Sequence, residues 1–258
     1  MVDFKTKDKY GFEDLLKIMT ILRSPGGCVW DAEQTHETIR RDFLEETYEV
    51  CQAIDDNSTE DLCEELGDVL LQVVFHTEIE REAGNFDIDD VCDGVCKKMI
   101  YRHPHVFADT QVANSAEVIE NWDALKRVEK SQETETSALR SVARALPALW
   151  RAEKVQHKAA KAGVKQTSQQ AMANVAAACA KLQENPDDIG ANLGSLLFAC
   201  VGLAEASGRL DCEVLLHDAA DRFVDRFDQA EKACLEHNSS IRDLPEEESL
   251  ALLHAENA

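Results

Sequence analysis

Apolar residues recur three and four positions apart along nearly the whole chain, which is the spacing that places side chains on one face of an α-helix. No segment sustains the alternation of apolar and polar residues that is typical of a β-strand. We therefore predict an all-α fold. In the first half, the apolar stripes predict helices around residues 15–22, 43–54, 62–79 and 89–102, and a further helix that opens at Asn114.

Residues that end or start helices stand between these stripes. The segment 24–27, Ser-Pro-Gly-Gly, ends the first helix, and the segment 55–58, Asp-Asp-Asn-Ser, ends the second. Gly84 follows the third helix, where a left-handed cap suits glycine. Asn114 and Glu117 have the spacing of a capping box, which predicts the start of the helix that follows.

Parts of the first half recur in the second half. The segment 67–71, Gly-Asp-Val-Leu-Leu, is echoed by 194–198, Gly-Ser-Leu-Leu-Phe, and the segment 82–87 is echoed by 206–211. Because two copies of one helical unit explain these echoes, we predict a tandem repeat. The expected organisation is a first copy over 1–130, a polar linker over 131–145 and a second copy over 146–258.

Charge restricts the partners of this chain. Its 27 lysines and arginines stand against 50 aspartates and glutamates, a net charge of −23, so we expect no nucleic-acid partner, although a local basic pocket could still hold a small phosphate ligand. No signal segment and no apolar stretch of about 18 uncharged residues is apparent, so we expect no membrane partner. The nine cysteines, odd in number and without a Cys-x-x-Cys pair, are interpreted as reduced core residues of a cytoplasmic protein.

A group of carboxylates carries the strongest chemical signal. Glu45, Glu46 and Glu49 lie on the second predicted helix, and Glu65 and Asp68 lie on the third. Residues three or four apart share a helix face, and the short turn between the helices folds them antiparallel, so we expect these carboxylates to meet. Their repulsion requires compensation, for which a hard divalent cation with oxygen ligands is the natural candidate. The alternative is a solvated acidic face, which is common in an acidic chain.

The second copy favours the metal site over the solvated face. Solvated acids would be lost independently, whereas all of these carboxylates are missing from the second copy together. Apolar positions around them persist, and in the first copy the flanking Leu44, Val50, Leu66 and Val69 are expected to face the core. The residues that stand opposite the carboxylates in the second copy are Ala177, Ala178, Lys181, Asn192 and Ser195.

Basic residues follow the carboxylates along the first copy. Lys98 and Arg102 share a face of the fourth predicted helix, and Trp122 and Lys126 share a face of the fifth. Carboxylate-bound magnesium with lysine and arginine opposite can clamp a polyphosphate. Trp122 either stacks on a nucleobase or packs in the core, and the pattern does not choose between them. The chain has no P-loop motif.

Several of these segments together form a family signature. They are Gly-Cys-Val-Trp-Asp at 27–31, Leu-Glu-Glu-Thr-Tyr-Glu-Val at 44–50, Glu-Glu-Leu-Gly-Asp at 64–68, Arg-His-Pro-His-Val-Phe at 102–107 and Trp-Asp-Ala-Leu-Lys at 122–126. In this order, over about half of the chain, they resemble the MazG family of nucleoside triphosphate pyrophosphohydrolases. The carboxylate pattern alone is shared with other all-α pyrophosphatases, whereas the tryptophan and His-Pro-His segments are MazG-like.

The resemblance implies tandem units of four-helix-bundle type, a homodimer, and magnesium-dependent cleavage of nucleoside triphosphates to monophosphates and pyrophosphate, with Mn²⁺ as an alternative ion. In some members of this family the second copy carries the working carboxylates, whereas here Ala177, Ala178, Lys181, Asn192 and Ser195 cannot hold magnesium, so we expect catalysis in the first copy only. We expect the degenerate second copy to be a scaffold or a dimerisation half, in which Arg222 and Arg226 could bind a regulatory nucleotide. The implied metal ligands are Glu46, Glu49, Glu65 and Asp68; the implied catalytic residues are Glu45, Glu46, Lys98 and Arg102; and the implied substrate-binding residues are Lys98, Arg102, Trp122 and Lys126.

Three other functions stay open at this point. A non-catalytic helical interaction or scaffold protein would bind nucleotides without hydrolysing them. A di-iron carboxylate bundle needs paired Glu-x-x-His motifs, and in the first copy only Glu33 and His36 have that spacing, near an expected loop. A narrower relative, such as an all-α dUTPase or a phosphoribosyl-ATP pyrophosphohydrolase, would keep the carboxylates but select one base or sugar.

Overall fold

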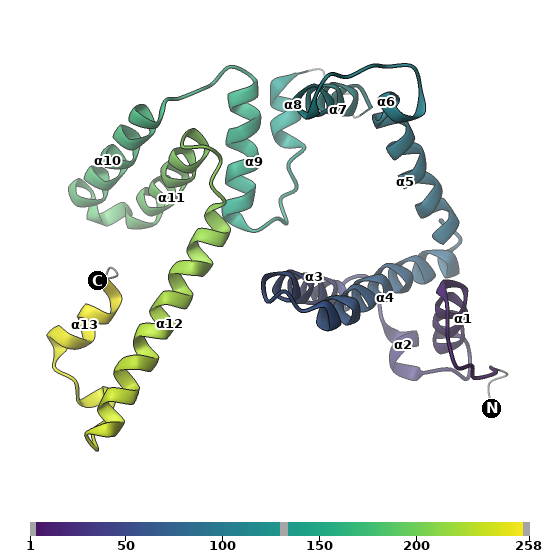
Figure 1. Ribbon diagram of the computed structural model, residues 1–258, viewed down its shortest axis with the longest axis horizontal. Coiled ribbons are helices and arrows are strands. Elements are labelled where there is room, and N and C mark those ends of the chain that lie inside the picture. Colours follow the sequence, from purple (N-terminus) through teal and green to yellow (C-terminus); the bar gives the residue numbers. More distant parts are fainter. Residues whose placement is uncertain (1–3, 130–133, 255–258) are drawn as a thin grey trace. The chain divides into compact units, whose positions relative to one another are not determined.

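The computed structural model describes residues 4–129 and 134–254, and within these ranges it contains helices and no strand, which confirms the all-α prediction (Figure 1). Before the gap the helices are α1 (Phe12–Arg23), α2 (Val29–Glu33), α3 (Arg40–Asp55), α4 (Thr59–Ala83), α5 (Ile88–Arg102), α6 (Pro104–Phe107) and α7 (Ser115–Glu129). After it they are α8 (Glu135–Arg140), α9 (Ala148–Lys161), α10 (Ser168–Glu184), the 3₁₀ turn η1 (Pro186–Asp188), α11 (Ile189–Ala206), α12 (Cys212–Glu236), the 3₁₀ turn η2 (Ile241–Asp243) and α13 (Glu246–His254).

Local sequence signals set the ends of these helices. Gly84 caps α4 at φ 75°, a left-handed conformation that glycine adopts without a steric penalty, so the predicted cap is confirmed. At the start of α7, the Asn114 side chain accepts a hydrogen bond from the Glu117 N–H at 3.1 Å, as the capping box requires. The Glu117 carboxylate accepts from the N–H of Ala113 at 2.9 Å, one residue earlier than the standard box.

Contacts divide the chain into two compact units, residues 1–125 and 126–258. Helix α7 runs across this division, so one continuous helix leads from the first unit into the second. The expected first copy ends a few residues later, at 130, and that boundary stays a prediction. Part of the segment expected to be a linker, 135–140, forms the short helix α8.

The core of the first unit joins α1, the turn before α3, and α4. Met19, Ile39, Val74 and Phe75 are buried together, and partly buried leucine and isoleucine side chains of α1 and α4 pack against them. Helices α3 and α4, joined by a turn of three residues at 56–58, form a hairpin that extends from this core. The hairpin brings the carboxylate-bearing segments of two helices side by side.

The second unit contains the same order of elements. Helices α10 and α11 form a hairpin, α9 packs against α11, and the long helix α12 follows and packs on α9. In the first unit α1 packs against α4 of its hairpin, and α5 follows. This parallel supports the predicted tandem repeat, in which α10 and α11 correspond to α3 and α4.

One helix is more apolar than expected, and the expectation that the cysteines are core residues is wrong. Among the described helices, α11 is long and apolar enough to cross a membrane, judged by length and composition only. The core helix of a protein can meet the same criterion, and α11 packs against α9 and α10. The cysteines are free thiols, as expected, but most are not core residues, because they lie on helix faces that the rest of the chain does not cover. The exposed ones are Cys51, Cys63, Cys92, Cys96, Cys179 and Cys200, and only Cys234 is buried.

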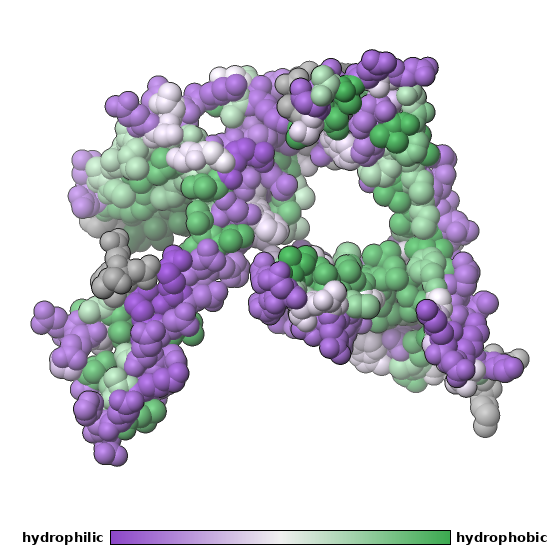
Figure 2. All heavy atoms as spheres, viewed as in Figure 1, coloured by the Kyte–Doolittle hydropathy of each residue, from purple (hydrophilic) through white to green (hydrophobic). Residues whose placement is uncertain are grey.

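The first hairpin also exposes apolar side chains that were expected to face the core. Leu44 is 49% exposed and Leu66 is 51% exposed, whereas Val50 and Val69 are half-buried. Figure 2 shows apolar side chains gathered on the surface of the molecule. The amphipathic pattern predicts that this face of the hairpin is covered, but within one chain nothing in the described residues covers it fully.

Candidate functional site

Three carboxylates meet on the hairpin of α3 and α4. Glu46 and Glu49 lie one turn apart on α3, and Glu65 lies in the second turn of α4. One ligand oxygen from each of these three residues lies within 4.8 Å of the other two. The helix spacing thus brings these three side chains to one point, as predicted. Three oxygens at this separation suit one small cation.

The electrostatics of this cluster favour a cation. Partial burial raises the pKa of the Glu46 carboxyl above its ordinary value, and the charge of Asp68 and a hydrogen bond with Glu49 raise it further. Desolvation also raises the pKa of Glu65, followed by the charges of Glu49 and Asp68. A proton or a cation is therefore held more tightly here than at an isolated glutamate.

The other two carboxylates of the predicted group differ from each other. Asp68 lies one turn after Glu65 on α4, half-buried, and its negative charge acts on both Glu46 and Glu65, so it borders the cluster. Glu45 is exposed on α3 and is not one of the three residues that meet. The structure therefore distinguishes the three clustered glutamates from Asp68 beside them and from Glu45 outside them.

One of the predicted basic residues packs against an aromatic ring. Arg102, the last residue of α5, is only 7% exposed, and its guanidinium carbon lies 5.4 Å from the centre of the Trp122 ring. The ring of His103 meets Trp122 edge-on at 4.8 Å, and its Nδ1 lies 2.6 Å from the carbonyl oxygen of Met99. Trp122 thus contacts both Arg102 and His103. Lys98 is half-buried one turn earlier on α5.

Lys126 is placed differently from the other predicted substrate-binding residues. It lies on α7, half-buried, one residue beyond Leu125, where the first unit ends. The predicted pair of Trp122 and Lys126 therefore spans the division between the units. The substrate-binding roles of this pair, and those of Lys98 and Arg102, stay predictions.

The first unit also contains a histidine network that was not predicted from the sequence. His36 Nδ1 lies 2.7 Å from Nδ1 of His76, and His36 Nε2 lies 2.6 Å from the Glu80 carboxylate, which also accepts a hydrogen bond from Asn85 at 2.6 Å. The ring of Phe43 on α3 packs against His76 at 5.7 Å. Burial, and then His36, lower the pKa of His76. His76 and Glu80 share a face of α4, but no local signal pairs them with His36, which lies 40 residues earlier.

This network helps to fix the segment that leads into α3. Arg23, at the end of α1, donates to the carbonyl oxygens of Asp31 and Gln34 at 2.5 and 3.2 Å, and it forms a two-pronged ion pair with Glu82 at 2.9 and 3.0 Å. Together with His36, these contacts tie the loop before α3 to the C-terminal half of α4. The carboxylate cluster therefore sits on a hairpin whose base is held by hydrogen bonds.

The corresponding positions of the second unit hold no such cluster. Ala178 is buried, and the Ser195 hydroxyl donates to the carbonyl oxygen of Ala191 in its own helix at 2.9 Å. Asn192 donates to the carbonyl oxygen of Asn185 at 3.3 Å. In the described part of the chain, the three glutamates of α3 and α4 are the one group that could hold a metal ion.

Arg226, one of the two arginines predicted to bind a nucleotide, makes contacts within the second unit. Arg226 donates from Nε to the carbonyl oxygen of Leu252 at 3.1 Å, and its guanidinium carbon lies 5.9 Å from the centre of the Phe223 ring. It therefore fastens α13 to α12. The expectation that Arg222 and Arg226 bind a nucleotide stays a prediction.

Comparison with known proteins agrees with this geometry. A MazG nucleotide pyrophosphohydrolase domain matches residues 34–107, a range that holds the carboxylate cluster, Asp68, Lys98 and Arg102. The chain is 41% identical over 233 residues to a nucleoside triphosphate pyrophosphohydrolase of Escherichia coli K12, covering 84% of this chain and 86% of that protein. It is 36% identical over 237 residues to the nucleoside triphosphate pyrophosphohydrolase/pyrophosphatase MazG of Thermotoga maritima, covering 91% of each chain.

A third relative matches over a smaller part of both chains. YabN of Bacillus subtilis, an uncharacterized protein, is 46% identical over 145 residues, which is 56% of this chain and 29% of that protein. Since the other two matches extend over most of both chains, and the helical hairpin carries the carboxylates that the motifs predict, this protein belongs to the MazG family.

Proposed function

We propose that this protein is a magnesium-dependent nucleoside triphosphate pyrophosphohydrolase whose catalytic site is the hairpin of α3 and α4. The observation that carries the proposal is the meeting of Glu46, Glu49 and Glu65 within 4.8 Å, in a family whose relatives are named for this activity. The reaction splits the bond between the first and second phosphates of the nucleotide, and water supplies the oxygen and protons that complete the monophosphate and the pyrophosphate.

The residues present fit a divalent cation. Carboxylate oxygens are the ligands that Mg²⁺ and Mn²⁺ prefer, and burial together with the charges of neighbouring carboxylates raises the pKa of Glu46 and of Glu65, so a bound cation would relieve an unfavourable environment. We assign Glu46, Glu49 and Glu65 as ligands, with Asp68 beside them. When bound, the ion would supply positive charge to phosphate oxygens and lower the pKa of a water molecule.

The other groups of the site bind and orient the substrate in this proposal. Lys98 and Arg102 neutralise phosphate charge from α5, where stacking against Trp122 keeps the Arg102 guanidinium in one orientation. Lys126 adds charge from α7. Trp122 orients the Arg102 guanidinium. Its half-buried position also allows a second role, which is contact with a nucleobase. Glu45, exposed on α3, orients water at the edge of the cluster.

A homodimer is part of the proposal. Leu44 and Leu66 expose about half of their surface on the catalytic hairpin, and Tyr48 exposes 46%. A second copy of the chain would cover this face, as the amphipathic pattern requires. Sedimentation equilibrium would detect the dimer, and a monomer at micromolar concentration would contradict it.

Phosphorus NMR of the reaction products tests the activity. With magnesium and a mixture of ribonucleoside and deoxyribonucleoside triphosphates, we expect monophosphates and pyrophosphate. The double variant Glu46→Gln/Glu49→Gln should lose at least about a hundredfold in rate, because oxygen ligands and the charge they hold are removed. Glu64→Gln is the matched control, since Glu64 is an exposed glutamate of α4 outside the cluster.

The other outcomes are equally informative. Full activity in the double variant would place catalysis outside the first hairpin. Turnover of a single nucleotide in the mixture would indicate a narrow dUTPase-like or phosphoribosyl-ATP-like enzyme. Nucleotide binding without turnover by the folded wild-type protein would favour the scaffold function. Activity that EDTA does not abolish would refute metal dependence.

A further inference from the structure

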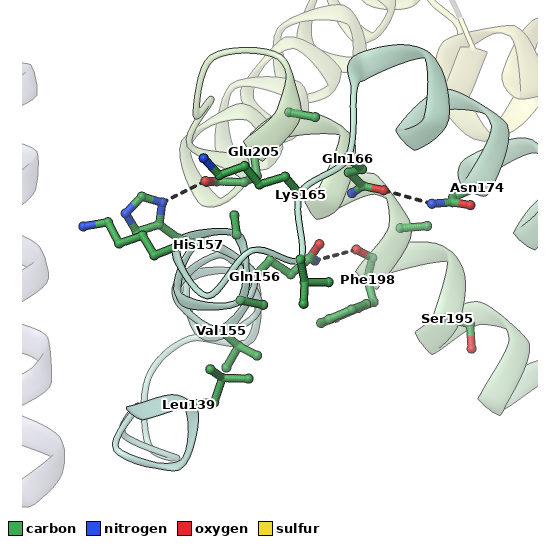
Figure 3. Close-up of a pocket in the computed structure, with 16 residues that line it drawn as sticks. Leu139, Val155, Gln156, His157, Lys165, Gln166, Asn174, Ser195, Phe198 and Glu205 are labelled. Atoms are coloured by element: carbon green, nitrogen blue, oxygen red, sulfur yellow. Dashed lines mark hydrogen bonds and ion pairs between the residues drawn. The ribbon is translucent and has the colours of Figure 1, made fainter. Parts of the chain in front are cut away.

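The second unit contains a cavity that the proposed reaction does not use. Its volume is about 800 Å³, and it lies between α9, the loop that leads to α10, and α11 (Figure 3). Ser195, the residue aligned with Asp68 of the first unit, lines this cavity, whereas the residues aligned with the three clustered glutamates do not. The cavity therefore borders the place where a metal ligand would stand in an intact copy, but it is built from different side chains.

Carboxamides are arranged along the cavity in fixed orientations. Gln156 donates to the carbonyl oxygen of Phe198 at 2.8 Å, and Gln166 donates to that of Gly202 at 3.2 Å. Asn174 donates to the Gln166 side-chain oxygen at 2.9 Å. A carboxamide has two donor hydrogens and an acceptor oxygen, so each of these side chains keeps further hydrogen-bonding capacity. Oriented amides with both donors and acceptors suit the edge of a nucleobase.

A hydrogen-bonded histidine and glutamate lie at the other end of the same cavity. Figure 3 shows His157 and Glu205 at one end and Gln166 with Asn174 at the other. His157 Nδ1 lies 2.8 Å from Glu205 Oε1. Glu205 Oε2 is buried, has no hydrogen-bond partner among the described residues, and lies 3.7 Å from the Arg209 guanidinium. A buried acceptor without a hydrogen bond costs free energy, so Glu205 favours a ligand that brings an N–H or O–H group.

Apolar surface and charge define the ligand further. The Phe198 ring, Val155 and small alanine side chains line the cavity, which gives a flat heterocycle an apolar contact. Lys161 and Lys165 also line it, against the single carboxylate Glu205. Lys165 offers positive charge to a phosphate group, while the Arg209 guanidinium, 3.7 Å from Glu205 Oε2, offsets the charge of that carboxylate. The four charges of a triphosphate would require a cation, and no carboxylate cluster in the described part of this unit could hold one.

We propose that this cavity is a metal-independent binding site for a nucleoside monophosphate. The base lies along Phe198 with its polar edge on the Gln166 and Asn174 amides, and the phosphate lies near Lys165. This role goes beyond the proposed hydrolysis, because it belongs to the second unit and requires neither a metal ion nor turnover. A second copy of the chain that fills the cavity is the competing occupant.

Calorimetric titration with AMP and GMP in EDTA tests the site. The full chain carries Glu46→Gln/Glu49→Gln, so the carboxylate cluster contributes no binding. We expect one monophosphate per chain, and we expect Lys165→Gln to weaken it about tenfold while adenosine binding stays unchanged. Lys154→Gln, an exposed lysine of α9 that does not line the cavity, is the matched control and should bind as the parent does.

Photolabelling locates the ligand independently. Labelling by 8-azido-AMP should fall on peptides within residues 139–206 and be competed by AMP. Absence of monophosphate binding, equal loss in Lys154→Gln, equally tight binding of inorganic phosphate alone, or labelling confined to the first unit would each overturn the proposal. None of these results depends on whether the protein hydrolyses triphosphates, so the two proposals fail separately.

Discussion

Replacement of Glu46 by glutamine should change the stability of the protein in opposite directions with and without magnesium. In EDTA the Glu46 carboxylate faces Glu49 and Glu65 with oxygens no more than 4.8 Å apart. Glutamine keeps the size of the side chain and removes its charge. With magnesium the same change removes a ligand. The sign of the effect therefore depends on the ion.

The size of the metal-free effect follows from Coulomb's law. Two unit charges 4.8 Å apart repel each other by about 0.9 kcal/mol even at the dielectric constant of bulk water. Screening by salt reduces this value, and the partial burial of Glu46 increases it, so we expect Glu46→Gln to raise the free energy of unfolding in EDTA by about 1 kcal/mol. For a unit of this size, that corresponds to an increase of about 3 °C in Tm.

Magnesium should reverse the order of the two proteins. A ligand present at about a hundred times its Kd stabilises the folded state by about 2.7 kcal/mol. The wild-type chain should gain stability of this order at millimolar Mg²⁺, and Glu46→Gln should gain little. Differential scanning calorimetry of both proteins, in EDTA and in magnesium, measures the crossing.

The matched control separates the cluster from general surface charge. Glu64→Gln removes an exposed charge next to Glu65 but leaves the three ligands in place. It should show a small change in EDTA and the full magnesium effect. If Glu46→Gln proved less stable than the wild type in EDTA, the reasoning about uncompensated repulsion would be refuted. Equal magnesium effects in both proteins would show that Glu46 is not a ligand.

Three further predictions concern pH and packing. In EDTA, the stability difference between Glu46→Gln and the wild type should shrink as the pH falls through the raised pKa of Glu46, because the protonated wild-type carboxyl no longer repels its neighbours. Thermal scans between about pH 8 and pH 5 measure this difference in Tm, and a difference that widens at low pH would contradict the predicted repulsion. Gly27→Ala should lower the free energy of unfolding by about 2–4 kcal/mol, since the added Cβ would stand 2.2 Å from the carbonyl oxygen of Ile21. Gly94→Ala, with open space around it on α5, should raise the free energy of unfolding by about 0.5–1 kcal/mol. Urea unfolding compares the two variants, and equal effects would show that the loop around Gly27 moves to accept the Cβ. Met19→Ala should cost about 2–4 kcal/mol because Met19 is 1% exposed in the core, and a loss below 1 kcal/mol in the same assay would show that the core refills the space.

The sequence predicted those features of the fold that depend on neighbouring residues. Helix α4 and its left-handed cap at Gly84 follow from apolar periodicity and one glycine. The helices α2 and α6 were not predicted, because four or five residues are too short to show a period. The periodic stripe that contains Leu66 indicates a covered face, but periodicity does not say what covers it.

The candidate site was predictable to the same extent. Glu46 and Glu49 share a face by helix spacing, and the short turn before α4 brings Glu65 to them, so local rules suffice for the cluster. The histidine network joins His36 to His76, which are distant in sequence, and only the packing of the loop against α4 brings them together. Arg102 shows the same limit, because its contact with Trp122 depends on how α7 returns to α5.

The exchange of glutamates for Ala177, Ala178 and Lys181 in the α10–α11 hairpin gives the two halves different dependence on ion supply. The contacts of the first hairpin include like charges at short range, which the proposed cation would offset. The second hairpin carries no such conflict in its described residues. Under the proposed function we therefore expect the second half to complete its native packing without an ion during synthesis or magnesium starvation, and the first half to open more easily under the same conditions. Because the second copy lacks these carboxylates, we expect its folding to be independent of ion supply.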